Sequence, residues 1–373
     1  MRKITTTQVA SATWAADTTI QTNLERVGLI TRIEFTVEIT PSATLTGANQ
    51  PDGIFRLPQN LRIQGGSHTY FTLPADDGCA GGTLLHYQNV LDGFGPGHYN
   101  GAIAAPQATY QPVNFVLHCG TRPKGAFGRD NPFDMSGFIP AGLESQLVAD
   151  WTTSGNDVMD DAVTITSAVG RFTLHRVLGS PQELVAEMAR QGVVLPDGAH
   201  GMAPAWSAVN HANGATTTDF DAEQIDIVVG GFLKRISAIF QDATATRTLR
   251  ASDEIERWAI KVPRTSETLY EARTYLAASK MGLSTVITAN SGAAESGGTE
   301  KMGADFNGHA AYGIDFIDMR ERRSTALGRE YGWDVRAAAV GDLKLGLYIL
   351  TRAAGDDTLV IFERFIPITV PLG

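Results

Sequence analysis

Eight histidines carry the most versatile side-chain chemistry in this chain, and their spacing argues against a metal site. No two of them form an HxH or HExxH arrangement, and the sequence contains no CxxC pair. Isolated histidines are more often surface or turn residues than metal ligands. We therefore expect no metal and no cofactor at the histidines, which are His68, His86, His98, His118, His175, His200, His211 and His309.

Other motifs for catalysis are also absent from the sequence. We find no GxSxG nucleophile elbow and no Walker-type phosphate loop. Three pairs of adjacent aspartates could hold a cation, but neighbouring carboxylates in extended chain point to opposite sides, and solvation is the simpler interpretation. These pairs are Asp76 with Asp77, Asp160 with Asp161, and Asp356 with Asp357. The sequence thus predicts that the protein is not an enzyme.

The two cysteines, Cys79 and Cys119, are too few for a disulfide framework and lack metal-ligand spacing. We expect free thiols. The N-terminal residues include two basic side chains but no apolar run after them, so no signal peptide is predicted. No stretch approaches the roughly 18 apolar residues of a membrane span. These features predict a soluble protein made in a cytoplasm.

The charge of the chain excludes some partners and suggests another. The net charge is −10 and charged residues make up only 19 % of the chain, which argues against direct, sequence-specific binding to nucleic acid. The densest charge run is a group of arginines beside Glu321 and Glu330. It is either a solvated rim or a patch of salt bridges between subunits, because arginine is favoured at interfaces. These candidate intersubunit residues are Arg320, Arg322, Arg323 and Arg329.

The elements that would position such residues are mainly β-strands. In Gly28–Thr40, apolar residues at 29, 33, 35, 37 and 39 alternate with polar ones, which predicts a strand with one buried and one wet face. Gly231–Phe240 repeats the pattern of Gly, two apolar residues, a polar residue, Arg and Ile. The repetition predicts two β domains of the same kind, each built around one copy.

Further short strands are predicted on both sides of the chain's middle. In the first half they cover 55–63, 69–73, 113–119, 133–140, 143–151, 162–169 and 171–178, and in the second half 225–240, 258–262, 314–319, 343–349 and 359–365. The residues before position 23 are expected to form a flexible arm or an edge strand, with an arm that docks on a neighbour as the sharper alternative. The glycine-rich stretch Thr288–Ala311 is predicted to be an exposed outer loop that tolerates insertion.

Three helices are predicted between the strands. Ser180–Gly192 combines an N-cap serine, a proline at the first helical position and Glu183 for a capping box. Thr83–Gly93 and Glu267–Met281 are predicted as equivalent helices of the two halves. We expect residues 1–180 to form a first jelly roll with its N-terminal arm, 181–223 a helical connector and linker loop, and 224–373 a second jelly roll. The fold class is all-β, with two tandem jelly-roll sandwiches and a few short helices.

This pattern resembles the double jelly-roll major capsid proteins of icosahedral viruses, the group that includes tectivirus-like phages and adenovirus-like coats. The resemblance lies in GLITRIEFTVEIT after a threonine-rich N-terminal segment, in the doubled strand order and in the helix of each half. It implies a homotrimer of pseudo-hexagonal outline that tiles an icosahedral shell, with no catalytic residues. It also implies lateral contacts between trimers, minor capsid or vertex proteins as partners, and an internal membrane vesicle in some relatives.

Two other functions use similar folds. A cupin-type metal enzyme would need two nearby histidines on one strand and a carboxylate a few residues on, which the sequence lacks. A carbohydrate-binding or adhesin sandwich would favour clustered aromatic residues, whereas the five tryptophans are scattered. Metal analysis would decide the first alternative, and sizing by light scattering would decide the second.

Overall fold

The structure of the chain is a computed structural model. It describes residues 1–13, 18–41, 58–66, 68–73, 84–85, 88–89, 92, 94, 113–124, 128–153, 165–213, 224–241, 255–273, 311–316, 331–349 and 357–372. None of the helices among these residues is long and apolar enough to cross a membrane.

The first half of the chain forms two antiparallel four-stranded sheets. One has the order β1-β8-β3-β6, with bounds Arg2–Thr13, Ile165–Leu178, Leu29–Pro41 and Val113–His118. The other has the order β2-β7-β4-β5, with bounds Thr19–Asn23, Leu147–Thr153, Pro58–Gly65 and Thr69–Thr72. A short 3₁₀ helix, Ala141–Leu143, precedes β7. The N-terminal segment thus supplies two edge strands, which was one of the two predictions for it.

The second half repeats this arrangement. Its first sheet has the order β10-β18-β12-β15, with bounds Ser207–Ala212, Asp357–Ile368, Phe232–Gln241 and Ala311–Asp315. Two short strands extend this sheet, β9 (Gly201–Pro204) beside β18 and β16 (Trp333–Asp334) beside β12. The other sheet has the order β11-β17-β13-β14, with bounds Gln224–Asp226, Lys344–Ile349, Ile255–Val262 and Glu267–Arg273.

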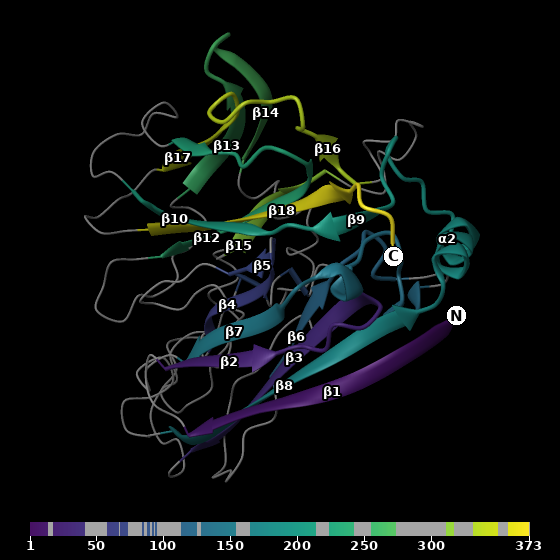
Figure 1. Ribbon diagram of the computed structural model, residues 1–373. Coiled ribbons are helices and arrows are strands. Elements are labelled where there is room, and N and C mark those ends of the chain that lie inside the picture. The colour runs from purple at the N-terminus through teal and green to yellow at the C-terminus, as the bar shows by residue number, and fades with distance from the viewer. Residues whose placement is uncertain are drawn as a thin grey trace.

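The two halves therefore correspond strand for strand. β1, β8, β3 and β6 match β10, β18, β12 and β15, while β2, β7, β4 and β5 match β11, β17, β13 and β14. Two four-stranded sheets with this crossed connectivity form a jelly roll. The predicted fold class, two tandem jelly rolls with few helices, is confirmed. Figure 1 shows the first jelly roll below and the second above, with both chain ends near the same helix, α2.

The matching central strands β3 and β12 share a register slip as well as a sequence pattern. Their register against β8 and β18 slips between Ile30 and Arg32 in the first half, and between Leu233 and Arg235 in the second. A glycine opens each copy because the facing strand passes very close. A Cβ on Gly28 would lie 2.6 Å from the carbonyl oxygen of Val177, and a Cβ on Gly231 would lie 2.5 Å from that of Phe365.

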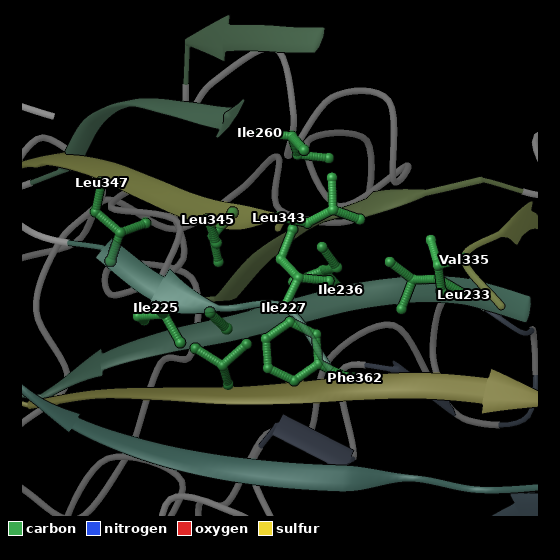
Figure 2. Packing of buried hydrophobic residues seen from close by; sticks show 12 residues of the cluster. Ile225, Ile227, Leu233, Ile236, Ile260, Val335, Leu343, Leu345, Leu347 and Phe362 are labelled. Atoms are coloured by element: carbon green, nitrogen blue, oxygen red, sulfur yellow. The ribbon is translucent and has the colours of Figure 1, made fainter. Parts of the chain in front are cut away.

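Each jelly roll has its own apolar core. In the first, Phe35 stacks on Phe172 with ring centroids 4.6 Å apart and meets the edge of Trp151 at 5.2 Å. In the second, aliphatic residues from facing sheets pack around Phe362, among them Ile236, Ile260 and Leu345 (Figure 2). The alternation predicted for β3 holds from Ile33 to Val37, where buried and half-exposed residues alternate. It fails at Arg32, predicted on the wet face but only 1 % exposed, because the register slip next to it shifts the strand.

Helix α2, Pro181–Arg190, lies where the sequence predicts it. Ser180 accepts a hydrogen bond from the backbone N–H of Glu183, and the Glu183 carboxylate accepts one from the backbone N–H of Ser180. The helix buries Leu184 and Met188 in a cluster that includes the C-terminal Leu372. The helix and the C-terminal segment together cover one end of the first jelly roll. Of the predicted helix at 83–93, the described residues at 84–85 and 88–89 are helical.

Several predicted elements are wrong. Glu267–Arg273 is strand β14 and not the start of a helix, because it pairs along its length with β13. Residues 133–140 form turns and one bridge, Ile30 with Ile139, instead of a strand. The predicted loop 193–223 contains β9 and β10, and the strands predicted at 162–169 and 171–178 are one strand, β8. The rest of the predicted 267–281 helix and most of Thr288–Ala311 lie outside the described residues.

The sheet built on β12 and β18 is buried on both faces at its centre. Val360 and Phe362 belong to the core of the second jelly roll, so Leu359 and Ile361 point to the opposite face, yet all four are fully buried. Ser237 on that opposite face is also buried. This outer face is the place where the first half meets the second.

Candidate functional site

The sequence-predicted site residues cannot be placed. Arg320, Arg322, Arg323 and Arg329 all lie outside the described residues, as does Cys79. Cys119 is a buried free thiol, and burial raises its pKa. Within the part of the chain that the structure describes, no group of three or more His, Cys, Asp or Glu residues could hold a metal ion.

The described residues instead bring polar side chains together at the junction between the two jelly rolls. Asn89 accepts a hydrogen bond from the backbone N–H of Val116 on β6 and donates one to the carbonyl oxygen of the same residue, both at 2.7 Å. Its neighbour Gln88 donates to the hydroxyl of Ser237 on β12, at 3.2 Å. The helical residues of the first half therefore join the edge of its own sheet to the outer face of the second half's sheet.

Four charged residues, which we call the ionic cluster, lie beside this bridge. Arg235 donates to Asp92 at 2.7 Å and to Glu363 at 3.2 Å, and Lys234 lies 3.0 Å from Glu363 and 3.9 Å from Asp92. Adjacent residues of a regular strand point to opposite faces, so both cations reach the same carboxylates because the register slips at Lys234. Asp92 comes from the first half, and the other three residues from the second.

The electrostatics of the cluster favour charged side chains. Burial acts to raise the pKa of Asp92, but the charges of Arg235 and Lys234 and the Arg235 hydrogen bond outweigh it and lower the pKa to about 2. Arg235 and Glu363 are 3 % and 0 % exposed, so water does not screen their attraction. The cluster joins the two jelly rolls across their junction.

The first half contains the equivalent arginine in a different setting. Arg32 is matched to Arg235 by the shared register slip, and its guanidinium holds the carboxylate of Asp130 through two hydrogen bonds of 2.8 and 2.7 Å. It also lies over the ring of Phe94, 4.6 Å from the centroid. The Arg32 hydrogen bond is the main cause that lowers the pKa of Asp130. Here the arginine fixes a loop of its own half and not the neighbouring jelly roll.

A histidine, an aspartate and a serine also meet in the first half, in an order unsuited to catalysis. Asp134 accepts from the Ser136 hydroxyl at 2.8 Å and lies 3.1 Å from Nε2 of His118. In a catalytic triad the histidine lies between the serine and the aspartate and takes the serine's proton. Here the aspartate lies between the serine and the histidine. All three are buried, and burial is the main cause that lowers the pKa of His118. The group holds the turn after β6 in place.

An apolar groove of about 390 Å³ lies between α2 and the C-terminal residues. Its lining is aliphatic except for His200, with Val185, Met188, Leu195, Pro371 and Leu372 among the lining residues.

The sequence analysis missed the ionic cluster, although one signal pointed to it. The related motifs GLITR and GFLKR both end in an arginine, and these two arginines are Arg32 and Arg235. Their carboxylate partners carry no such mark, because Asp92 stands 143 residues from Arg235 in the chain and Asp130 stands 98 residues from Arg32.

Known proteins resemble this chain in fold and not in sequence. No protein-family model matches this chain, and no curated protein matches it by sequence. The crystal structure of the STIV major capsid protein (MCP) matches with a TM-score of 0.65 at 14 % identity, over 98 % of this chain and 97 % of that one. A chain of the atomic structure of Sulfolobus turreted icosahedral virus matches with a TM-score of 0.63 at 15 % identity, over 98 % and 91 %. The chain therefore has the double jelly-roll fold of this viral major capsid protein.

Proposed function

We propose that this chain is a major capsid protein that forms homotrimers of pseudo-hexagonal outline, which tile an icosahedral virus shell. The observation that supports the proposal most is the full-length match of both jelly rolls, in order, to the STIV MCP. A shared fold alone does not fix function, but this match leaves almost none of either chain uncovered. The architecture suits a shell, because each subunit supplies two similar wall units.

The junction supports the same role. A shell subunit must hold its two jelly rolls at a fixed angle so that its edges match those of its neighbours. The ionic cluster and the bridge from Gln88 to Ser237 clamp the rolls across two separate points. We propose that the protein acts as a structural component of the virion and not as an enzyme.

Several finer features belong to this proposal. The protein would be made in the host cytoplasm, and its partners would be further copies of itself, minor capsid or vertex proteins and, beneath the shell, an internal membrane vesicle. Residues 1–180 and 224–373 would be the two building units, with β9 and β10 of the 181–223 connector adding to the second unit's sheet. The arginines at 320–329 stay candidate intersubunit residues.

Sedimentation velocity of the purified protein at micromolar concentration tests the proposal first, and a trimer is expected. Electron microscopy of concentrated protein or of virions should then show pseudo-hexagonal particles in closed shells. A stable monomer under all assembly conditions would contradict the proposal, and so would stoichiometric iron, zinc or manganese with turnover of a substrate.

A further inference from the structure

The two jelly rolls contact each other through different surfaces, although they share one fold. The first roll contributes the edge strand β5 and the helical residues before Phe94. The second contributes Trp206, just before β10, and the outer face of β12 and β18. In such a head-to-tail contact the two rolls use different surfaces. Each roll therefore keeps an unused surface, the one equivalent to the surface that the other roll uses. Repeated contacts of this kind build rings or filaments.

Register identifies the unused surface of the first roll. The register slips in β3 and β12 make Arg32 the counterpart of Arg235. Two residues further on, Glu34 therefore corresponds to Ser237. On the paired strands β8 and β18, His175 corresponds to Glu363 and Thr173 to Ile361.

The edge strands β1 and β10 correspond in the same way. Thr6 pairs with Leu174 on β8, and Ser207 pairs with the equivalent Phe362 on β18. The preceding residues, Thr5 and Trp206, are therefore counterparts. The outer face around Thr5 therefore stands where the second roll receives its neighbour.

Register also identifies the unused surface of the second roll. The pairing of β4 with β5 skips Tyr70, and the pairing of β13 with β14 skips Leu269. Tyr70 is the residue whose carbonyl oxygen accepts the backbone N–H of Trp206, at 2.9 Å. The adjacent Phe71 meets the Trp206 ring edge-on, with centroids 4.9 Å apart. Leu269, at the outer edge of β14, is thus the counterpart of the residue that docks within the chain.

Both unused surfaces reach solvent in the single chain. Leu269 is 45 % exposed, whereas Tyr70 is 1 % exposed. On the first roll the corresponding surface, which we call the polar face, is defined by Thr5, Thr7, Glu34, Thr173 and His175. Thr5 and Thr7 are exposed, and the other three are partly exposed, with the ring of Phe133 against that of His175. Its side chains bond one another across strands, Thr7 with Thr173 at 2.9 Å and His175 with Glu34 at 3.0 Å.

The polarity of each receiving face fits the stage at which that face is covered. The face of the second roll, with Leu359 and Ile361, is covered as the chain folds, so it can be apolar. A face that waits for another subunit must stay soluble until assembly, and interfaces between preformed partners are about as polar as ordinary surface. The threonine-rich polar face has that composition.

We propose that the polar face around Thr5 receives the β14 edge at Leu269 of a second copy, in the way that Trp206 receives Tyr70 within the chain. The inference rests on the proposed homotrimer, since three copies joined by this contact close a ring of alternating first and second rolls. Leu269 of each subunit then lies beside Thr5 of the next, and the contact between subunits imitates the contact inside each subunit.

Cross-linking tests this contact directly. The double variant Thr5→Cys with Leu269→Cys, treated with a short thiol-specific cross-linker, should give covalent dimers and trimers on denaturing gels. Each single variant, which controls for the native cysteines, should give none above the unmodified protein. A trimer by sedimentation without cross-linking of the double variant overturns the inference and leaves the proposed function standing. An unmodified protein that forms no trimer overturns both.

Substitution provides a second test. Leu269→Asp and Thr7→Arg place charge on the two surfaces and should weaken trimer formation at least tenfold in protein concentration. Val340→Asp is the matched control, because Val340 is 83 % exposed and lies on neither surface. Circular dichroism of all three variants should stay unchanged. Trimers as strong as those of the control would refute the docking surface.

Discussion

Removing the charge of Arg235 should weaken the whole subunit more than any surface substitution. The variant Arg235→Met keeps much of the side-chain volume but removes a cation that binds both Asp92 and Glu363, and among the described residues Lys234 still pairs with both carboxylates. Breaking a buried ion pair by removing one partner costs about 3–5 kcal/mol, because a charge stays buried without its counterpart. We expect a loss in the free energy of unfolding of that size.

The electrostatics of Asp92 point in the same direction. Asp92 has its pKa lowered from 3.8 to about 2 in the folded chain. A difference of this size corresponds to about 2 kcal/mol of stabilisation from Asp92 alone, and Arg235 also binds Glu363. Both effects predict that the Arg235→Met variant is less stable.

A matched control pair occurs on the surface. Arg336 and Asp334 also lie 2.7 Å apart, but their side chains are 46 % and 41 % exposed. Exposed pairs contribute about 0–1 kcal/mol, so Arg336→Met should be nearly neutral. Urea unfolding of both variants at one fixed protein concentration measures the difference. If Arg235→Met loses no more stability than Arg336→Met, the ionic cluster is not a clamp.

The cluster also predicts a pH dependence. Because folding lowers the pKa of Asp92, its contribution is fully present above the ordinary value of 3.8 and is lost as the pH falls toward about 2. The native protein should therefore lose about 2 kcal/mol more than an Asp92→Asn variant across this range. Parallel loss in both proteins would show that other carboxylates dominate.

Three further predictions follow from the described residues. Gly28→Ala should lower the free energy of unfolding in urea by about 1–3 kcal/mol, because φ is +74° at Gly28 and a Cβ there would meet a carbonyl oxygen. Gly142→Ala is the control and should be near neutral, because the nearest atom to a Cβ at Gly142 is 3.9 Å away. Phe35→Ala should cost about 3–5 kcal/mol, because it removes a ring packed between two others, and a smaller loss would contradict the described core. In a Cys79→Ser background, Cys119 should resist thiol reagents until the chain unfolds, because the residue is buried; rapid labelling of folded protein would contradict this.

How much of the fold the sequence can reveal depends on how local the pattern is. Alternation over five residues from Ile33 and the capping box at Ser180 involve near neighbours, and both predictions hold. The burial of Arg32 could not be predicted, because it follows from a register slip against another strand. The junction was equally out of reach, since Asp92 and Arg235 meet only once both jelly rolls have packed.

The wrong helix after Ser266 has a specific physical cause. Serine before a run of residues with helical spacing is a common N-cap, and Leu269 and Ala272 are three residues apart. In the structure Ser266 has φ +55°, a left-handed conformation, whereas N-cap residues typically have extended dihedral angles. Ser266 belongs to the turn between β13 and β14. Pairing with β13 outweighs the weak helical preference, as tertiary context often does.

A comparison of the equivalent strands β8 and β18 shows what the sequence does encode about assembly. Residues 359–362 read Leu-Val-Ile-Phe, a continuous apolar run typical of a strand buried on both faces, whereas their counterparts at 171–174 read Arg-Phe-Thr-Leu and alternate. The fold is the same, so the difference reflects what covers each strand. The second roll's outer face is covered within the chain, whereas the first roll's polar face stays partly exposed. We therefore expect any partner of the first face to bind after folding, and in the proposed contact this partner is the edge at Leu269 of another copy of this chain.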